Sequence, residues 1–428
     1  MHMKQISDKV MLALRRCKTK GKQYTVKDIL QEHETIVKLD DGYKIFKTLR
    51  NSPPYLEKRQ KDLMAMIRQL GCPTYFVSLS AADTKWADLL RILDRFIDNK
   101  EYTDVELENM DWSTKTRLVQ SDPVTCVRYF DHRLQTFVHD ILKDKLHPIG
   151  CIKDFFIRIE FQQRGSPHAH IMFWIERGPI FGKNTHSEIV SFIDKLISCS
   201  SNVKDSSKPF LEMQQPKHSK TCRKKSKAIC RFGFPKPPMQ TTMLLEPPDT
   251  QANIKDDKVR YEKIADYLDQ HKDGIDLSFA EFLDTLKLTY QQYISALRTS
   301  IKTPAVFLKR DPSDIRVNPY MKNILEVYAA NHDIQYITDP YACAVYIVAY
   351  MSKSQRGMSN LMAQACRETR NGNLNLRQQV RNIGNKFLNT VEVSAQEAVY
   401  LLLQLPITRS SRSVVLLTLH LQLKELSS

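Results

Sequence analysis

The sequence predicts an α+β fold built around a β-hairpin. Short apolar runs alternate with longer amphipathic ones, and residues 155–176 read as two strands joined by a tight turn at residues 164–167. The 428 residues are enough for two or three packed units. No run of about eighteen apolar residues is present, so we expect no membrane-spanning helix and no membrane partner.

The helices and strands before the hairpin are predicted from the periodicity of apolar residues and from helix-breaking residues. Residues 56–70 have helical periodicity, which Gly71, Cys72 and Pro73 end. Residues 74–80 (TYFVSLS) read as a buried strand, and Thr84 is placed to cap a helix over 85–99. A further helix is expected over 123–143. The elements expected after the hairpin are helices at 187–198, 259–268, 279–299 and 341–353, strands at 305–308 and 333–337, and more helices to about residue 405.

A change in composition divides the chain. Pro, Ser and Lys dominate residues 200–256, with little periodicity, which indicates an insertion between two parts of one core. We therefore expect an N-terminal polar region at 1–51, a first core part at 52–199, the insertion at 200–256, a second core part at 257–405 and a tail at 406–428.

The hairpin contains the first candidate functional site, a candidate metal site. In a strand, residues two apart point to the same face, so His168 and His170 should lie side by side, opposite the apolar Ala169 and Ile171. If the apolar faces of the two strands coincide, Glu160 and Gln162 fall across from the histidines. Two imidazoles and one oxygen ligand suit Mg²⁺ or Mn²⁺. The alternative is a solvent-facing histidine pair on an edge hairpin.

The motif His-Ala-His within EFQQRGSPHAH resembles the His-apolar-His signature of HUH nucleases, and in particular the Rep domain of Helitron transposons. The resemblance continues through blocks in the family's order, at residues 52–86, 122–137, 218–238 and 318–359. It implies an HUH-type antiparallel sheet flanked by helices, with the histidine pair on a central strand. It also implies an endonuclease that nicks and joins single-stranded DNA during rolling-circle transposition.

A candidate nucleophile helix spans residues 341–353. Tyr346 and Tyr350 are four residues apart and share one helix face. The resemblance implies that they attack a DNA phosphodiester and form a 5′-phosphotyrosine link. Because a free phenol has a pKa of about 10, a nearby metal and Lys353 would assist its ionisation. The alternative is an aromatic stripe packed in a core.

The insertion holds a second candidate metal site. His218, Cys222 and Cys230 lie close together in the sequence, and Cys199 is our first choice as the fourth ligand of a structural zinc. The alternative is free thiols in a basic loop. The basic residues expected to contact DNA phosphates, which also suggest a nuclear-import signal, are Arg223, Lys224, Lys225, Lys227 and Arg231.

The composition indicates the class of binding partner and the state of the cysteines. The net charge of +16 favours a polyanionic partner, and the resemblance implies that this partner is single-stranded DNA. Nine cysteines without an apolar N-terminal run indicate reduced thiols or metal ligands rather than a secreted disulfide scaffold.

Two other functional interpretations stay open. The phosphate-cradling loop of an ATP-driven helicase, G-x-x-x-x-G-K-[ST], is absent, so we expect the chain to be a fragment of a Rep–helicase protein or to work with a helicase encoded downstream. Family members often carry a lysine before the second tyrosine, where this chain has Ala349. A decayed or domesticated DNA-binding module is therefore the alternative to the nuclease.

Overall fold

The computed structural model describes residues 53–161, 165–216, 230, 233–248, 254–271, 274–341, 344 and 393–414. The chain divides into two compact units, one of residues 1–71, 348–383 and 410–428, the other of residues 72–347 and 384–409. The described part of the first unit is mainly helix α5 (Pro53–Leu70), which confirms the helix expected there. Among the described helices, none combines the length and the apolar character that crossing a membrane requires.

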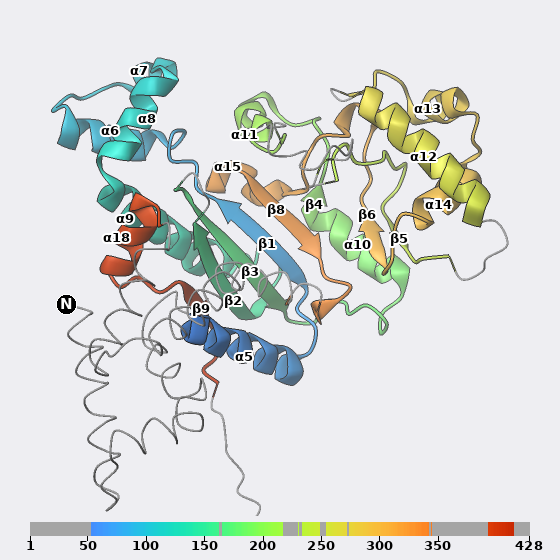
Figure 1. The fold of residues 1–428 in the computed structure, drawn as a ribbon, viewed down its shortest axis with the longest axis horizontal. Helices are drawn as coiled ribbons and strands as arrows, with labels where there is room; N and C mark the ends of the chain where they lie inside the picture. The colour runs from blue at the N-terminus through green and yellow to red at the C-terminus, as the bar shows by residue number, and fades with distance from the viewer. Residues whose placement is uncertain are drawn as a thin grey trace, which may run out of the picture. The chain divides into compact units, whose positions relative to one another are not determined.

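The second unit contains a five-stranded sheet, drawn at the centre of Figure 1. Its order is β8 (His332–Tyr336), β1 (Tyr75–Ser80), β3 (Pro167–Ile175), β2 (Ile152–Phe161) and β9 (Thr408–Ser410). Strand β3 pairs antiparallel with both β1 and β2, and β1 pairs antiparallel with β8. The fold is therefore α+β with an antiparallel sheet flanked by helices, as the sequence predicted, and the histidine strand β3 is central.

The hairpin register brings the apolar residues of β2 and β3 onto one face. Ile157 lies opposite Ile171 and Ile159 lies opposite Ala169, and all four are buried. Helices cover this face: the ring of Tyr75 stacks on Phe192 of α10 (His186–Leu196), with centroids 5.5 Å apart. The opposite face of the hairpin is also largely buried, so its histidines do not lie on a solvated surface.

Four helices and a π-helical turn lie between β1 and β2 in the sequence. They are α6 (Ala87–Ile97), α7 (Asp104–Asn109), α8 (Trp112–Ser121), α9 (Pro123–Thr136) and η2 (Phe137–Leu142). The expected cap at Thr84 is wrong, because α6 begins three residues later with Trp86 at its N-cap position. The short helices α7 and α8 were not predicted; Thr103 and Asp111 cap them through side-chain oxygens.

A second hydrophobic core is built by α12 (Ile254–Gln270), α13 (Phe279–Leu286) and α14 (Tyr290–Arg298). The sequence predicted α13 and α14 as one helix. The helix breaks because Lys287 adopts the left-handed conformation (φ 51°) and Thr289 starts a new capping box with Gln292.

The two-stranded sheet of β5 (Met243–Leu245) and β6 (Ala305–Phe307) joins this second core through Leu245 and the partly buried Phe307. Residues at the end of the expected insertion thus pack with residues that follow it.

Short elements connect the sheet to the second core. They are β4 (Ile197–Ser198), η3 (Asp205–Ser207), α11 (Lys208–Glu212), η4 (Pro312–Asp314), β7 (Tyr320–Met321), η5 (Lys322–Ile324) and α15 (Leu325–Tyr328). Leu211 of α11 packs on Val317, Tyr320 and Leu325. The amide of Gln214 donates to the carbonyl of Ala330, so this segment is tied to the start of β8.

The described C-terminal segment contains α18 (Ala395–Leu402) and β9. Strand β9 joins the sheet beside β2, with the Ile159 amide donating to the Ile407 carbonyl at 2.8 Å. The sequence did not predict this strand, because Thr408–Ser410 is too short and too polar to give a strand pattern. The nucleophile helix expected at 341–353 lies almost wholly outside the described residues.

Candidate functional site

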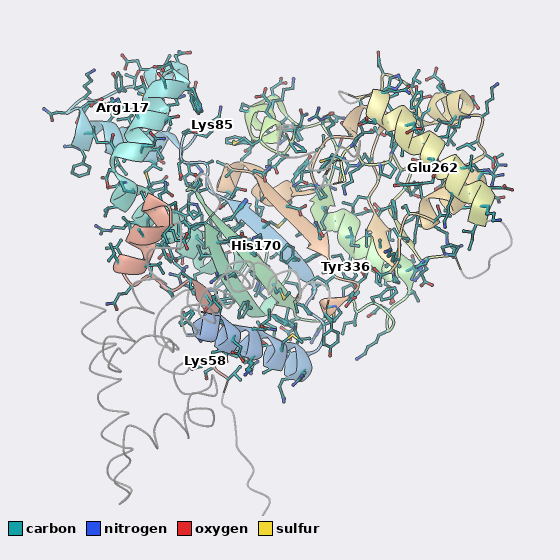
Figure 2. All side chains as sticks on the ribbon, viewed as in Figure 1. Lys58, Lys85, Arg117, His170, Glu262 and Tyr336 are labelled. Atoms are coloured by element: carbon teal, nitrogen blue, oxygen red, sulfur yellow. The ribbon has the colours of Figure 1, made fainter. Side chains whose placement is uncertain are left out.

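Two polar rows cross the central strands on the face opposite the apolar one. In the first row, Ser80 of β1 lies opposite His168 of β3, which lies opposite Glu160 of β2. In the second row, Ser78 lies opposite His170, which lies opposite Arg158. Cross-strand partners share a face of the sheet, so strand alternation alone gathers these side chains. Figure 2 labels His170 on these strands.

His170 is held on two sides. Its Nε2 lies 2.9 Å from Oε2 of Glu160, and its ring stacks on Phe76 with centroids 5.7 Å apart and planes at 17°. The residue is only 5% exposed. The carboxylate that the strand parity placed across from the histidines therefore contacts one of them directly.

His168 has a different partner. Its Nε2 lies 3.0 Å from Oγ of Ser80, and its ring centroid lies 5.9 Å from that of His170. Burial, and then the neighbouring His170, lower the pKa of His168 to about 3. The imidazole is therefore neutral near pH 7, which is the form that binds a metal ion.

The donor set of this site fits a divalent ion in its chemistry. It offers two imidazoles and the Glu160 carboxylate, and Nδ1 of His168 is buried without a hydrogen-bond partner among the described residues. Within the described ranges, however, no three His, Cys, Asp or Glu side chains gather closely enough to form a metal-binding group. Gln162, the other expected oxygen ligand, lies outside the described residues.

The expected nucleophiles are not placed. Tyr346, Tyr350 and Lys353 all lie outside the described residues. Tyr341 is described and is 54% exposed. That Tyr346 and Tyr350 lie close to the histidine pair therefore stays a prediction.

Two of the four expected zinc ligands are described. Cys199 and Cys230 are both buried. Burial lowers the pKa of Lys236 and raises that of the Cys199 thiol to about 11. Outside the described residues lie the other ligands, His218 and Cys222, and the expected DNA contacts Arg223, Lys224, Lys225, Lys227 and Arg231.

Sequence reasoning missed two residues of this site. Ser80 contacts His168, and Asn331 lies 3.4 Å from Ser80, measured from Ser80 Oγ to Oδ1 of the amide. The alternation in TYFVSLS placed Ser78 and Ser80 opposite the apolar residues, and that signal was available. Nothing local in the sequence could have indicated Asn331, which lies 251 residues from Ser80.

A third missed residue supports the hairpin turn. Asp83 is buried and accepts hydrogen bonds from Oγ of Ser166 at 3.0 Å and Nε2 of Gln396 at 3.2 Å. Burial raises the pKa of Asp83. The turn that precedes His168 is thereby tied to α18, far away in the sequence.

Comparison with known protein families gives a match over part of the chain. Residues 4–173 match the family model described as the Helitron helicase-like domain at the N-terminus. The match contains Ser80, Glu160, His168 and His170 and ends before Asn331. No curated protein matches the chain. The resemblance found in the sequence is thus confirmed over the segment that carries the histidine pair.

Proposed function

We propose that this chain, whose residues 4–173 carry a Helitron helicase-like N-terminal domain of the HUH superfamily, is an endonuclease that nicks and joins single-stranded DNA. The observation that carries the proposal is the pair of His170, which is buried, and His168, which is half-buried, on a central strand, with the Glu160 carboxylate 2.9 Å from His170. Two imidazoles and a carboxylate on one face of a sheet supply the ligand types that divalent ions use, and metal-assisted phosphoryl chemistry would employ such a site.

In this proposal His168 and His170, with Glu160 or Gln162, hold Mg²⁺ or Mn²⁺. The ion, when bound, would polarise the scissile phosphate and stabilise its developing charge. Glu160 orients the His170 ring through its hydrogen bond, and burial keeps His168 unprotonated. His168 thus offers a lone pair without first losing a proton at neutral pH.

The covalent step is assigned to Tyr346 or Tyr350. The phenol oxygen attacks phosphorus, the bond to the 3′ oxygen breaks, and a 5′-phosphotyrosine and a free 3′-hydroxyl result. Lys353 lies three residues after Tyr350 and would favour the phenolate. Two tyrosines would let one strand stay attached while a second is cut.

The Cys and His residues around the basic segment are proposed as a structural zinc site. The burial of the thiols of Cys199 and Cys230 supports their assignment as two of its ligands, with His218 and Cys222 completing four ligands. The basic residues 223–231 would contact DNA phosphates and direct the protein to the nucleus. A helicase domain encoded downstream is the expected protein partner.

A second candidate is a DNA-binding module that has lost cleavage. The observation that favours it is Ala349, which replaces a positive charge beside Tyr350 that the family often carries. Such a charge would lower the pKa of the phenol.

Incubation of a labelled single-stranded oligonucleotide with the protein and Mn²⁺ separates the two candidates. We expect a covalent protein–DNA adduct that survives denaturation, is abolished in His168→Ala, and is lost when Tyr346 and Tyr350 are both changed to Phe. Catalysis typically falls by factors of 10² or more when a member of such a site is removed.

Matched variants control for general damage. Tyr341→Phe removes an exposed phenol from the same segment, and His186→Ala removes a half-exposed imidazole; both should keep the adduct. DNA binding without any adduct in the unchanged protein would establish the module and reject the nuclease.

A further inference from the structure

A line of hydrogen bonds runs from the backbone to His168. The side-chain amide Nδ2 of Asn331 donates to the carbonyl of Met213 at 2.6 Å. Oδ1 of the same amide accepts from Oγ of Ser80 at 3.4 Å, and Oγ of Ser80 lies 3.0 Å from Nε2 of His168. These contacts connect, in this order, the Met213 carbonyl, the Asn331 amide, the Ser80 hydroxyl and the His168 ring.

The backbone holds both intermediate residues in place. The Ser80 amide donates to the Asn331 carbonyl at 3.0 Å, and the Tyr328 hydroxyl donates to the Ser80 carbonyl at 2.9 Å. Because Met213 supplies an acceptor, the Asn331 amide must present its NH₂ group to Met213 and its oxygen to Ser80. The orientation of the amide is therefore determined.

This orientation decides between two proton arrangements at His168. If Ser80 donates to Asn331, its oxygen accepts from a hydrogen on Nε2 of His168, and only the lone pair of Nδ1 lacks a partner among the described residues. If Ser80 donates to Nε2 instead, Oδ1 of Asn331 loses its donor and a buried N–H on Nδ1 is left unpaired. Since polar groups shielded from water are stabilised by hydrogen bonds and the first arrangement leaves fewer of them unpaired, it is favoured.

We propose that Ser80, held by Asn331, is a positioning residue that keeps His168 in one ring orientation with its hydrogen on Nε2 and a free lone pair on Nδ1. The two histidines of the pair are then held differently, His170 by a carboxylate and His168 by a hydroxyl. The free lone pair makes Nδ1 the nitrogen of His168 that is ready to bind a cation.

Nitrogen NMR of the full chain labelled at histidine tests the tautomer directly. Protonated and unprotonated ring nitrogens resonate far apart, and the signals of His168 are identified by their loss in His168→Gln. We expect one tautomer, protonated at Nε2, in the metal-free protein. Ser80→Ala should replace it with a mixture, and Asn331→Ala should do the same.

Three variants separate this role from a purely structural one. Ser80→Thr keeps the hydroxyl and should keep the single tautomer. Ser78→Ala removes a hydroxyl from the same face of the same strand and should leave His168 unchanged. Thermal melting identifies any variant that fails to fold. A wild-type His168 protonated at Nδ1, or a tautomer that Ser80→Ala leaves unchanged, overturns the proposal.

The measurement of metal affinity rests on the proposed function, whereas the measurement of the His168 tautomer does not. Calorimetric titration with Mn²⁺ alone should show an affinity about 10–100-fold weaker in Ser80→Ala than in the unchanged protein, the loss usual for residues that orient a metal-binding histidine. If the unchanged protein binds no Mn²⁺ but shows the expected tautomer, the metal assignment fails and the positioning role stands.

Discussion

His332 shows how a single buried side chain couples the fold to pH. Its Nε2 accepts a hydrogen bond from the Met321 amide at 3.0 Å, and its Nδ1 donates to the Ala330 carbonyl at 3.3 Å. Burial lowers the pKa of His332 to about 4. Protonation of Nε2 would remove the acceptor that the Met321 amide needs.

The sign of the pH effect follows. An unfolded histidine has a pKa of about 6.5, so between pH 6.5 and 4 the unfolded state binds a proton that the folded state does not. Stability should therefore fall as pH falls through this window, by up to about 1.4 kcal/mol per pH unit for His332 alone. His332→Gln should lose this share of the slope, measured by urea denaturation across pH. The half-exposed His186→Gln is the control, and an equal slope in His332→Gln would contradict the assignment.

At the same scale, strand parity was enough to place Glu160 with the histidines. The reason is that side-chain direction in a strand is fixed by position, so a hairpin with a recognisable apolar face leaves one arrangement for the other face. Asn331 was beyond such reasoning, because it reaches Ser80 only when β8 pairs beside β1.

Among the elements, the break between α13 and α14 was the clearest difference from the sequence prediction. Residues 279–299 have a nearly continuous helical pattern, but Lys287 takes the left-handed conformation, which costs a residue with a Cβ about 1 kcal/mol. The Leu288 amide donates to the Leu283 carbonyl at 3.1 Å and closes the helix end. The burial of Phe282 and Tyr293 in one hydrophobic core offsets the cost of this turn.

Replacement of Lys287 tests this account. Lys287→Gly should be about 1 kcal/mol more stable than Lys287→Ala, because glycine adopts φ 51° without strain whereas alanine does not. Both changes remove the same exposed side chain, so their difference in thermal unfolding reports the backbone alone. Equal stability of the two variants would mean that the helix break is not strained.

Across the molecule, one ion pair ties the C-terminal segment to the helical layer. Asp131 of α9 accepts from Arg409 at 2.8 Å and from the Tyr400 hydroxyl at 2.9 Å. Both charged side chains are more than four-fifths buried. Since Arg409 is itself a residue of β9, this cluster helps to hold the fifth strand in place beside β2.

Asp131→Ala should leave the Arg409 guanidinium with little compensation. We expect a loss of about 2–3 kcal/mol, less than the roughly 3–5 kcal/mol of a fully buried pair, because both side chains keep some contact with water. Urea denaturation measures the loss, and Asp140→Ala, an exposed change on the following turn, should cost little. Proteolysis at the C-terminal segment should become faster in Asp131→Ala only.

The sequence by itself determined the hairpin, the shared face of Glu160, His168 and His170, and the resemblance to the Helitron helicase-like domain, because each depends on local periodicity or on motifs read in order. The tertiary structure decided what those side chains contact. It brought Ser80 to His168, Asn331 to Ser80 and Arg409 to Asp131, and it split one expected helix into two. These contacts join residues far apart in the chain, and their free energy exists only once the strands have paired and the intervening segments have packed, which no local pattern records.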